Sequence, residues 1–147
     1  LFGEKPTAGA DDWFFLEQCA DLALLLISTT TSGNGDELFR RISKCKKVAV
    51  LNCYGADITD AGLKYFEGHP SLVQLSVDGA GVTDRSIPVL TGILKLRVLV
   101  LGDRVKITDH GMRSLLAAKP NIWMYKDDEL IEGAKHDGKG TTTSQRR

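Results

Sequence analysis

The chain has 147 residues, of which 42% are hydrophobic and 26% are charged, and this composition fits one ordinary domain with a continuous core. Nineteen basic residues balance nineteen acidic ones, so overall charge does not direct the protein to nucleic acid or to acidic lipid. The longest apolar stretch, Leu22 to Ile27, is far shorter than the roughly 20 residues that cross a bilayer, and we expect no transmembrane segment.

The N-terminal part of the sequence predicts a lead-in followed by a short helix. Residues 1–11 are rich in Gly, Pro and Ala, and we expect an extended segment. Asp11 and Asp12 precede the apolar run Trp13 to Ala20, and carboxylates favour a helix start. We therefore expect a helix at 12–21 that caps the apolar end of the domain that follows.

The central part of the chain repeats itself. Four apolar segments share one frame: Val48 to Cys53, Leu72 to Val77, Leu96 to Leu101, and Ile122 to Asp127. A second signature recurs between them at intervals of 24 and 25 residues: Ile58-Thr59-Asp60, Val82-Thr83-Asp84 and Ile107-Thr108-Asp109. This period, with an L-x-x-L-x-L strand and a short amphipathic segment, is typical of leucine-rich repeats. The predicted fold is an α/β leucine-rich-repeat solenoid over 22–131, with a short curved parallel sheet and helices on its convex side.

The punctuation between strands agrees with this fold. Leu24 to Thr29 fits the strand template as a divergent first repeat, and Asp36 to Ile42 has helical apolar spacing. Each Thr-Asp pair is predicted to cap the helical turn that follows it. Residues 132–147 contain no large apolar residue, and we expect a flexible tail or a segment laid against a partner.

Side-chain alternation along the strands assigns one face to the core and the other to solvent. Leu51, Leu75 and Leu99 are expected inside. The outward row is unusually apolar for a solvated surface, which favours a protein contact; the alternative is that a terminal segment folds over it. The predicted protein-binding residues are Leu26, Val50, Val73, Arg97, Val98, Val100, Trp123 and Met124.

A local run of basic residues is the strongest charge cluster: Arg40, Arg41, Lys44, Lys46 and Lys47. Such runs are commonly a solvated face, and the alternative is docking to an acidic subunit or to anionic lipid. The three cysteines are odd in number and form no C-x-x-C pair, so neither a disulfide framework nor a zinc site is indicated. The sequence contains no phosphate-binding or zinc-protease motif, and we predict no enzyme activity, no cofactor and no metal site.

The order of these features resembles a known family. A Trp13 helix that ends in Cys19-Ala20, a degenerate repeat, and then Cys45-Lys46-Lys47-Val48 and Ile58-Thr59-Asp60-x-Gly62-Leu63 are similar to the mitochondrial ATP synthase coupling factor B (subunit s) family and its relative, the distal membrane arm assembly component. The likeness covers residues 12–127. It departs at the family's Cys-x-Cys pair, because only Cys53 matches and Gly55 replaces the second sulfur.

The resemblance implies a non-catalytic accessory subunit or assembly factor of ATP synthase or respiratory complex I, on the matrix side of the inner mitochondrial membrane. A first residue Leu1 in place of methionine is compatible with a cleaved presequence. An F-box-type substrate adaptor of a ubiquitin ligase is the alternative, because such adaptors carry nearly the same Ile-Thr-Asp-x-Gly-Leu cassette. An adaptor would need an F-box upstream, whereas a mitochondrial subunit would have a presequence there.

Overall fold

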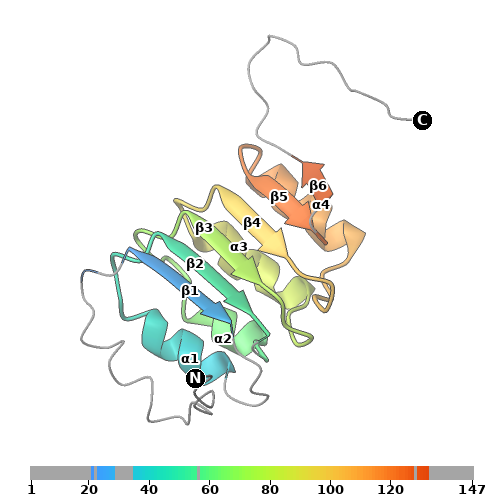
Figure 1. Ribbon diagram of the computed structural model, residues 1–147. Coiled ribbons are helices and arrows are strands. Elements are labelled where there is room, and N and C mark those ends of the chain that lie inside the picture. The colour runs from blue at the N-terminus through green and yellow to red at the C-terminus, as the bar shows by residue number, and fades with distance from the viewer. Residues whose placement is uncertain (1–20, 22, 29–34, 56, 128, 133–147) are drawn as a thin grey trace.

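The computed structural model describes residues 21, 23–28, 35–55, 57–127 and 129–132, which form an α/β fold with six strands and four helices (Figure 1). The strands are β1 (Leu24–Ser28), β2 (Val50–Tyr54), β3 (Gln74–Val77), β4 (Val98–Leu101), β5 (Trp123–Lys126) and β6 (Glu129–Glu132). The helices are α1 (Gly35–Ile42), α2 (Asp60–Lys64), α3 (Ile87–Gly92) and α4 (Asp109–Ala118). A 3₁₀ turn, Asp84–Ser86, leads into α3.

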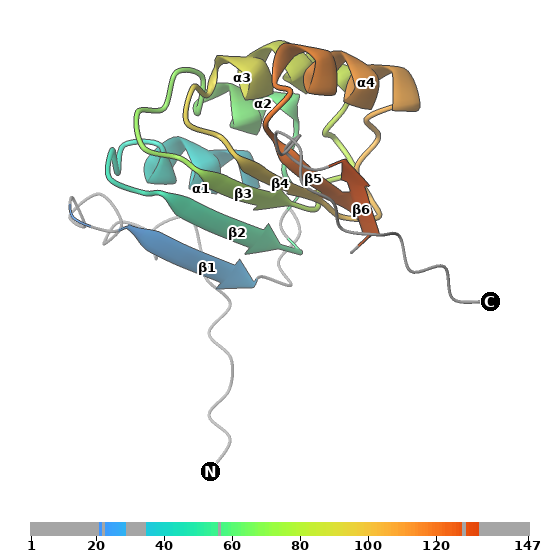
Figure 2. The same cartoon turned by 90° about the horizontal axis from the view of Figure 1, so that it is seen from above.

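The strands form one sheet in the order of the sequence, β1-β2-β3-β4-β5-β6. The first five strands are parallel, and β6 returns antiparallel beside β5. Parallel neighbours need a crossover, and each crossover here carries a helix. Figure 2 shows all four helices on one side of the sheet, so no described helix covers the other side. We call that uncovered side the outward face.

The core lies between the sheet and the helices. Leu51, Leu75 and Leu99 point inward from three neighbouring strands and are fully buried, as the sequence predicted. They meet apolar helix-side residues, which are also buried: Leu63, Phe66, Leu90, Met112 and Leu115. Full burial of one such side chain contributes roughly 1.5–3 kcal/mol. The aligned positions therefore form one continuous core rather than separate clusters.

The Thr-Asp pairs cap their helical turns and also join successive strand–helix units. Thr59 accepts a hydrogen bond from the Ala61 amide, at 3.1 Å, which confirms the predicted cap. The same threonine donates its hydroxyl and amide hydrogens to Asp36 of the preceding unit, at 2.6 and 2.8 Å. Thr83 binds Asp60 and Thr108 binds Asp84 in the same way. Each aspartate therefore stabilises the next unit in the chain.

Two parts of the predicted organisation lie outside the described residues. The first is the lead-in together with the predicted capping helix, of which only Asp21 is described. The second is the tail from residue 133. At the C-terminal end the structure contains a strand, β6, that was not predicted from the sequence. Only two residues separate it from β5. Asp127 has a φ of 52°, the left-handed conformation that a tight turn requires and that aspartate tolerates. Glu132, assigned to the tail, belongs to β6.

The register of β5 corrects one predicted residue. Val98 pairs with Trp123, and Leu99 pairs with Met124, so the interval from β4 to β5 is 25 residues. The sequence alignment placed Ile122 opposite Leu96, an interval of 26 residues, and so assigned Met124 to the outward face. A shift of one residue exchanges the two faces of a strand. Met124 is in fact fully buried, and the outward residues of β5 are Trp123 and Tyr125.

Candidate functional site

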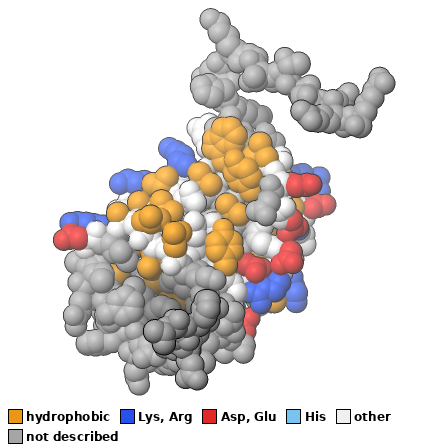
Figure 3. All heavy atoms as spheres, in the orientation of Figure 1, with side chains coloured by type: hydrophobic (Ala, Val, Ile, Leu, Met, Phe, Trp, Pro, Cys, Tyr) orange, Lys and Arg blue, Asp and Glu red, His pale blue; other side chains and the backbone are white. Residues whose placement is uncertain are grey.

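The outward face carries apolar side chains at both ends of the sheet. At the β1 end, Leu24 and Leu26 are 53% and 64% exposed. In the register of β1, Leu26 lies beside Asn52, two residues from its expected place but on the same face. At the other end, Trp123 is 37% exposed and Leu130 of β6 is 51% exposed. Figure 3 shows hydrophobic atoms spread across this face, with a broad group over β5 and β6.

The middle of the outward face is polar and ordered by side-chain hydrogen bonds. The side-chain oxygen of Asn52 in β2 accepts hydrogen bonds from the side-chain amide of Gln74 at 3.1 Å and from the Ser76 hydroxyl at 2.9 Å. Because Asn52 joins β2 to β3, these side chains hold a fixed geometry between the two apolar regions. Val98 and Val100 on β4 are half-buried and continue the apolar surface from this centre toward Trp123.

Five of the eight predicted binding residues belong to the outward row: Leu26, Val50, Val98, Val100 and Trp123. Val73 and Arg97 directly precede β3 and β4; Val73 is half-buried, and Arg97 is exposed. Met124 points inward, as described above. Sequence reasoning missed Tyr125 and Leu130, which are paired across β5 and β6. The apolar pair Leu130-Ile131, which closely follows the turn at Asp127, is the sequence signal that could have revealed Leu130.

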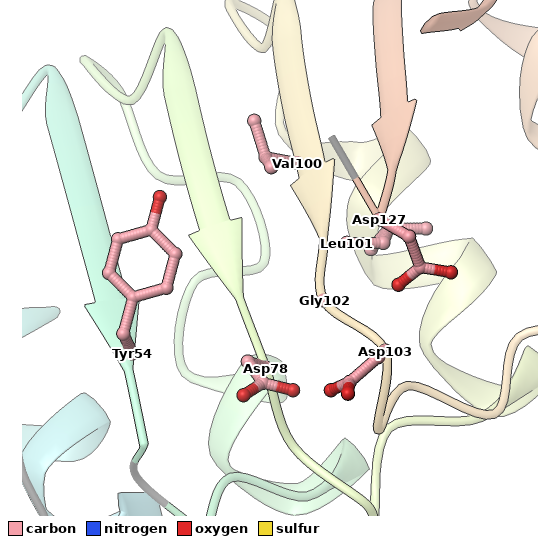
Figure 4. Close-up of a pocket in the computed structure, with 7 residues that line it drawn as sticks. All are labelled: Tyr54, Asp78, Val100, Leu101, Gly102, Asp103 and Asp127. Atoms are coloured by element: carbon pink, nitrogen blue, oxygen red, sulfur yellow. The ribbon is translucent and has the colours of Figure 1, made fainter. Parts of the chain in front are cut away.

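A pocket of about 300 Å³ opens at the carboxyl-terminal edge of the outward face (Figure 4). The residues that line it lie at the ends of four neighbouring strands or directly after them: Tyr54, Asp78, Val100, Leu101, Gly102, Asp103 and Asp127. Figure 4 shows the carboxylates of Asp78 and Asp103 turned toward each other. The sequence analysis did not predict this pocket, because its residues come from four strand ends that only the sheet brings together.

The carboxylates of the pocket differ in their partners. Asp78 is paired with Arg104, whose Nε lies 3.2 Å from Asp78 Oδ2, and the same guanidinium reaches Asp57 at 3.4 Å. Arg104 Nη2 also donates to the Asp78 carbonyl oxygen at 2.5 Å. Within the described part of the chain, no cation pairs with the side chains of Asp103 and Asp127. Both are exposed, so the pocket has a net negative charge.

The predicted basic cluster is partly engaged inside the molecule. Arg40 and Arg41 both bind Glu37, with nitrogen–oxygen distances of 2.6 and 2.9 Å. The hydrogen bonds from Arg40, opposed by a smaller effect of burial and supported by those from Arg41, lower the pKa of Glu37 to about 2. Lys47 pairs with Asp21. These contacts are those of a solvated ion-pair surface, and lipid binding stays a prediction.

The buried polar groups near the core have structural partners. His69 Nε2 lies 3.3 Å from the Cys45 carbonyl oxygen, and its Nδ1 accepts from the Ser71 amide at 3.4 Å. Burial is the main cause that lowers the pKa of His69, which favours the neutral ring. Among the described residues, no group of three or more His, Cys, Asp or Glu side chains is arranged to hold a metal ion.

Cys53 is predicted to be unreactive in the folded protein. Burial raises the pKa of its thiol to about 12, so the thiolate fraction at neutral pH is roughly 10⁻⁵. In a Cys19→Ser variant, we expect iodoacetamide to modify neither Cys45 nor Cys53 in the native state and both in denaturant, as measured by intact mass. Native labelling of Cys53 at the rate of a solvent-exposed thiol would contradict the buried position.

No protein-family model matches the sequence. Within the part of the chain that the structure describes, every helix is too short or too polar to cross a membrane.

Proposed function

We propose that this protein is a leucine-rich-repeat solenoid that acts as a non-catalytic protein-binding scaffold through its outward face. The observation that carries the proposal is the set of exposed apolar side chains on a sheet face that no described helix covers: Leu24, Leu26, Trp123 and Leu130. They form two groups, one at each end of this face. Grouped exposed apolar side chains mark interaction sites, whereas single exposed apolar residues are ordinary. The strand–helix period of 24 to 26 residues and the parallel register support the solenoid assignment.

The internal geometry favours rigid docking. The inward side of the sheet is fully packed, and hydrogen bonds through Asn52 fix the middle of the outward face. A rigid surface loses little conformational entropy when a partner binds. Trp123 lies at the β5 end beside Val98, and an exposed tryptophan supported by aliphatic neighbours is the type of residue that dominates interface energetics.

For the partner, we propose subunits of a mitochondrial inner-membrane complex, either ATP synthase or respiratory complex I. In this proposal the protein is an accessory subunit or assembly factor on the matrix side. The support is the resemblance over residues 12–127, which includes the Cys45-Lys46-Lys47-Val48 run before β2 and the Thr59-Asp60-x-Gly62-Leu63 cassette.

Replacing Trp123 with glutamate is expected to reduce co-purification of these subunits from mitochondria by at least about tenfold, since an interface anchor contributes about 2 kcal/mol or more. The measurement is quantitative mass spectrometry after affinity capture of the tagged full chain. The control is Ala117→Glu, which adds the same charge at an exposed position on α4, on the opposite side of the sheet from the outward face (Figure 2).

Two results would contradict the proposal. One is an equal loss for both variants, which would indicate a general effect of the added charge. The other is recovery of the wild-type chain without any subunit of either complex. Thermal unfolding of both variants serves to verify that the replaced residue, and not misfolding, accounts for a loss of binding.

A further inference from the structure

The two edges of the sheet carry opposite charge. The amino-terminal edge consists of the described residues that precede the strands: 21, 23, 43–49, 65–73, 93–97 and 119–122. It contains six basic and two acidic residues. The carboxyl-terminal edge consists of the residues between each strand end and the next helical or strand segment: 55, 57–59, 78–83, 102–108 and 127. It contains four acidic and two basic residues. In Figure 3, blue atoms gather where the strands begin, and red atoms gather where they end.

The charges at the amino-terminal edge lie close enough to influence one another. Burial, and after it the positive charge of Arg97, lowers the pKa of Lys119. The Lys119 ammonium donates to the Ile93 carbonyl oxygen at 2.7 Å, which holds it near the start of β4. A partner segment that crosses the sheet therefore meets a basic edge at one end and an acidic edge at the other.

The pocket at the acidic edge continues the apolar outward face. Val100 belongs both to the pocket and to the apolar row of β4, and Tyr54 is 49% exposed at the end of β2. A lysine or arginine stem can pack on Val100 and the Tyr54 ring, with its cationic head between Asp103 and Asp127. Arg104 already pairs with Asp78, so the remaining negative charge lies on the other two carboxylates.

We propose that the outward face binds a segment of a partner protein that is apolar where it crosses the sheet and that places a lysine or arginine in this pocket. The proposal rests on the proposed scaffold function and names the chemistry of its partner. The proposed occupant is a separate chain. The protein's own residues 133–147 are basic but contain no large apolar side chain to cover Trp123 and Val98. The apolar residues 13–20 are expected to cap the domain at the β1 end, the opposite end of the sheet from Trp123.

The test is selection of random short peptides displayed on phage against the full chain. Enriched peptides are expected to contain a lysine or arginine flanked by apolar residues. Their affinity, measured by calorimetry, should fall by about tenfold or more in Asp103→Asn/Asp127→Asn. The control, Asp109→Lys, changes the net charge by the same two units at one exposed position on α4, outside the pocket and both edges, and it should retain wild-type affinity.

The alternative outcomes separate the two proposals. Peptides that require Trp123 but show no basic preference, or that bind the Asp103/Asp127 double variant normally, would overturn the pocket proposal and leave the scaffold function standing. If no enriched peptide loses affinity for the Trp123→Glu variant, both the pocket proposal and the scaffold function are overturned. At least tenfold tighter peptide binding by Arg146→Gln/Arg147→Gln would identify the protein's own tail as the occupant. A wild-type dimer that dissociates in the Trp123→Glu variant would identify a second copy of the protein as the occupant. Either result would overturn the proposal that the occupant is a different protein.

Discussion

Replacing Asp60 with alanine is expected to lower the free energy of unfolding by about 3–5 kcal/mol, because one carboxylate serves three donors of the next unit. Asp60 accepts from the Thr83 amide at 2.8 Å and from the Thr83 hydroxyl at 2.6 Å, and it also accepts from the Ser86 hydroxyl. In Asp60→Ala these donors lose their charged acceptor. Because Ser86 is fully buried, water cannot easily replace that acceptor. Chemical denaturation of the wild type and the variant measures the difference.

Asp109→Ala is the matched control for this prediction. Asp109 occupies the same place after Thr108 as Asp60 does after Thr59, but it begins the last helix and is exposed. Within the described residues no following threonine binds its side chain. We expect a loss below about 1 kcal/mol, the magnitude of a carboxylate at a helix N-terminus. Equal losses at both positions would show that Asp60 acts only on its own helix and not across the units.

The dependence of this effect on pH has a definite direction. Burial is the largest single influence on Asp60 and raises its pKa. The hydrogen bonds from Ser86 and Thr83, together with the positive charge of Arg85, outweigh burial, so the net pKa is lowered below 3.8. A lowered folded pKa contributes stability that is present above the unfolded value and is lost as pH falls through the folded one. The stability difference between wild type and Asp60→Ala should therefore shrink below about pH 4.

How far the sequence predicts this fold depends on the regularity of the units. The recurrence of Thr59, Thr83 and Thr108 at intervals of 24 and 25 residues predicted the caps. The L-x-x-L-x-L frame placed Leu51, Leu75 and Leu99 in the core. The error at Met124 arose where the interval changes. Since the faces of a strand alternate with a period of two, a misplaced interval of one residue is sufficient to reverse a strand.

The pocket could not be predicted from the sequence for a different reason. Tyr54, Asp78, Asp103 and Asp127 are each ordinary residues at the end of a strand, and no local pattern distinguishes them. They become neighbours because four parallel strands end at one edge of the sheet. The partner of Asp78 is also distant in the sequence, since Arg104 lies in the turn after β4, one strand further along the sheet.

The glycine of the Thr-Asp-x-Gly cassette also has a role that spans two units. A Cβ at Gly62 would lie 2.2 Å from Asp36 Oδ1 and 3.0 Å from Asp36 Cα, so the carboxylate that binds Thr59 occupies its space. In the next unit Ser86 replaces this glycine. There the first turn is 3₁₀ rather than α-helical, and the serine hydroxyl donates to Asp60.

Gly62→Ala is consequently expected to destabilise the protein by about 2–4 kcal/mol, because the methyl group displaces the Asp36 carboxylate from Thr59 and has no polar contact to replace it. Gly62→Ser should lose less, since its hydroxyl can donate to Asp36 as Ser86 does to Asp60. Gly92→Ala is the control for helix propensity: its nearest neighbour, Glu67 Cγ, would be 3.7 Å away, and we expect no loss of stability. Denaturant melts of the three variants test this order. If Gly62→Ala is as stable as Gly62→Ser, the Asp36 carboxylate is not the group that requires glycine at position 62.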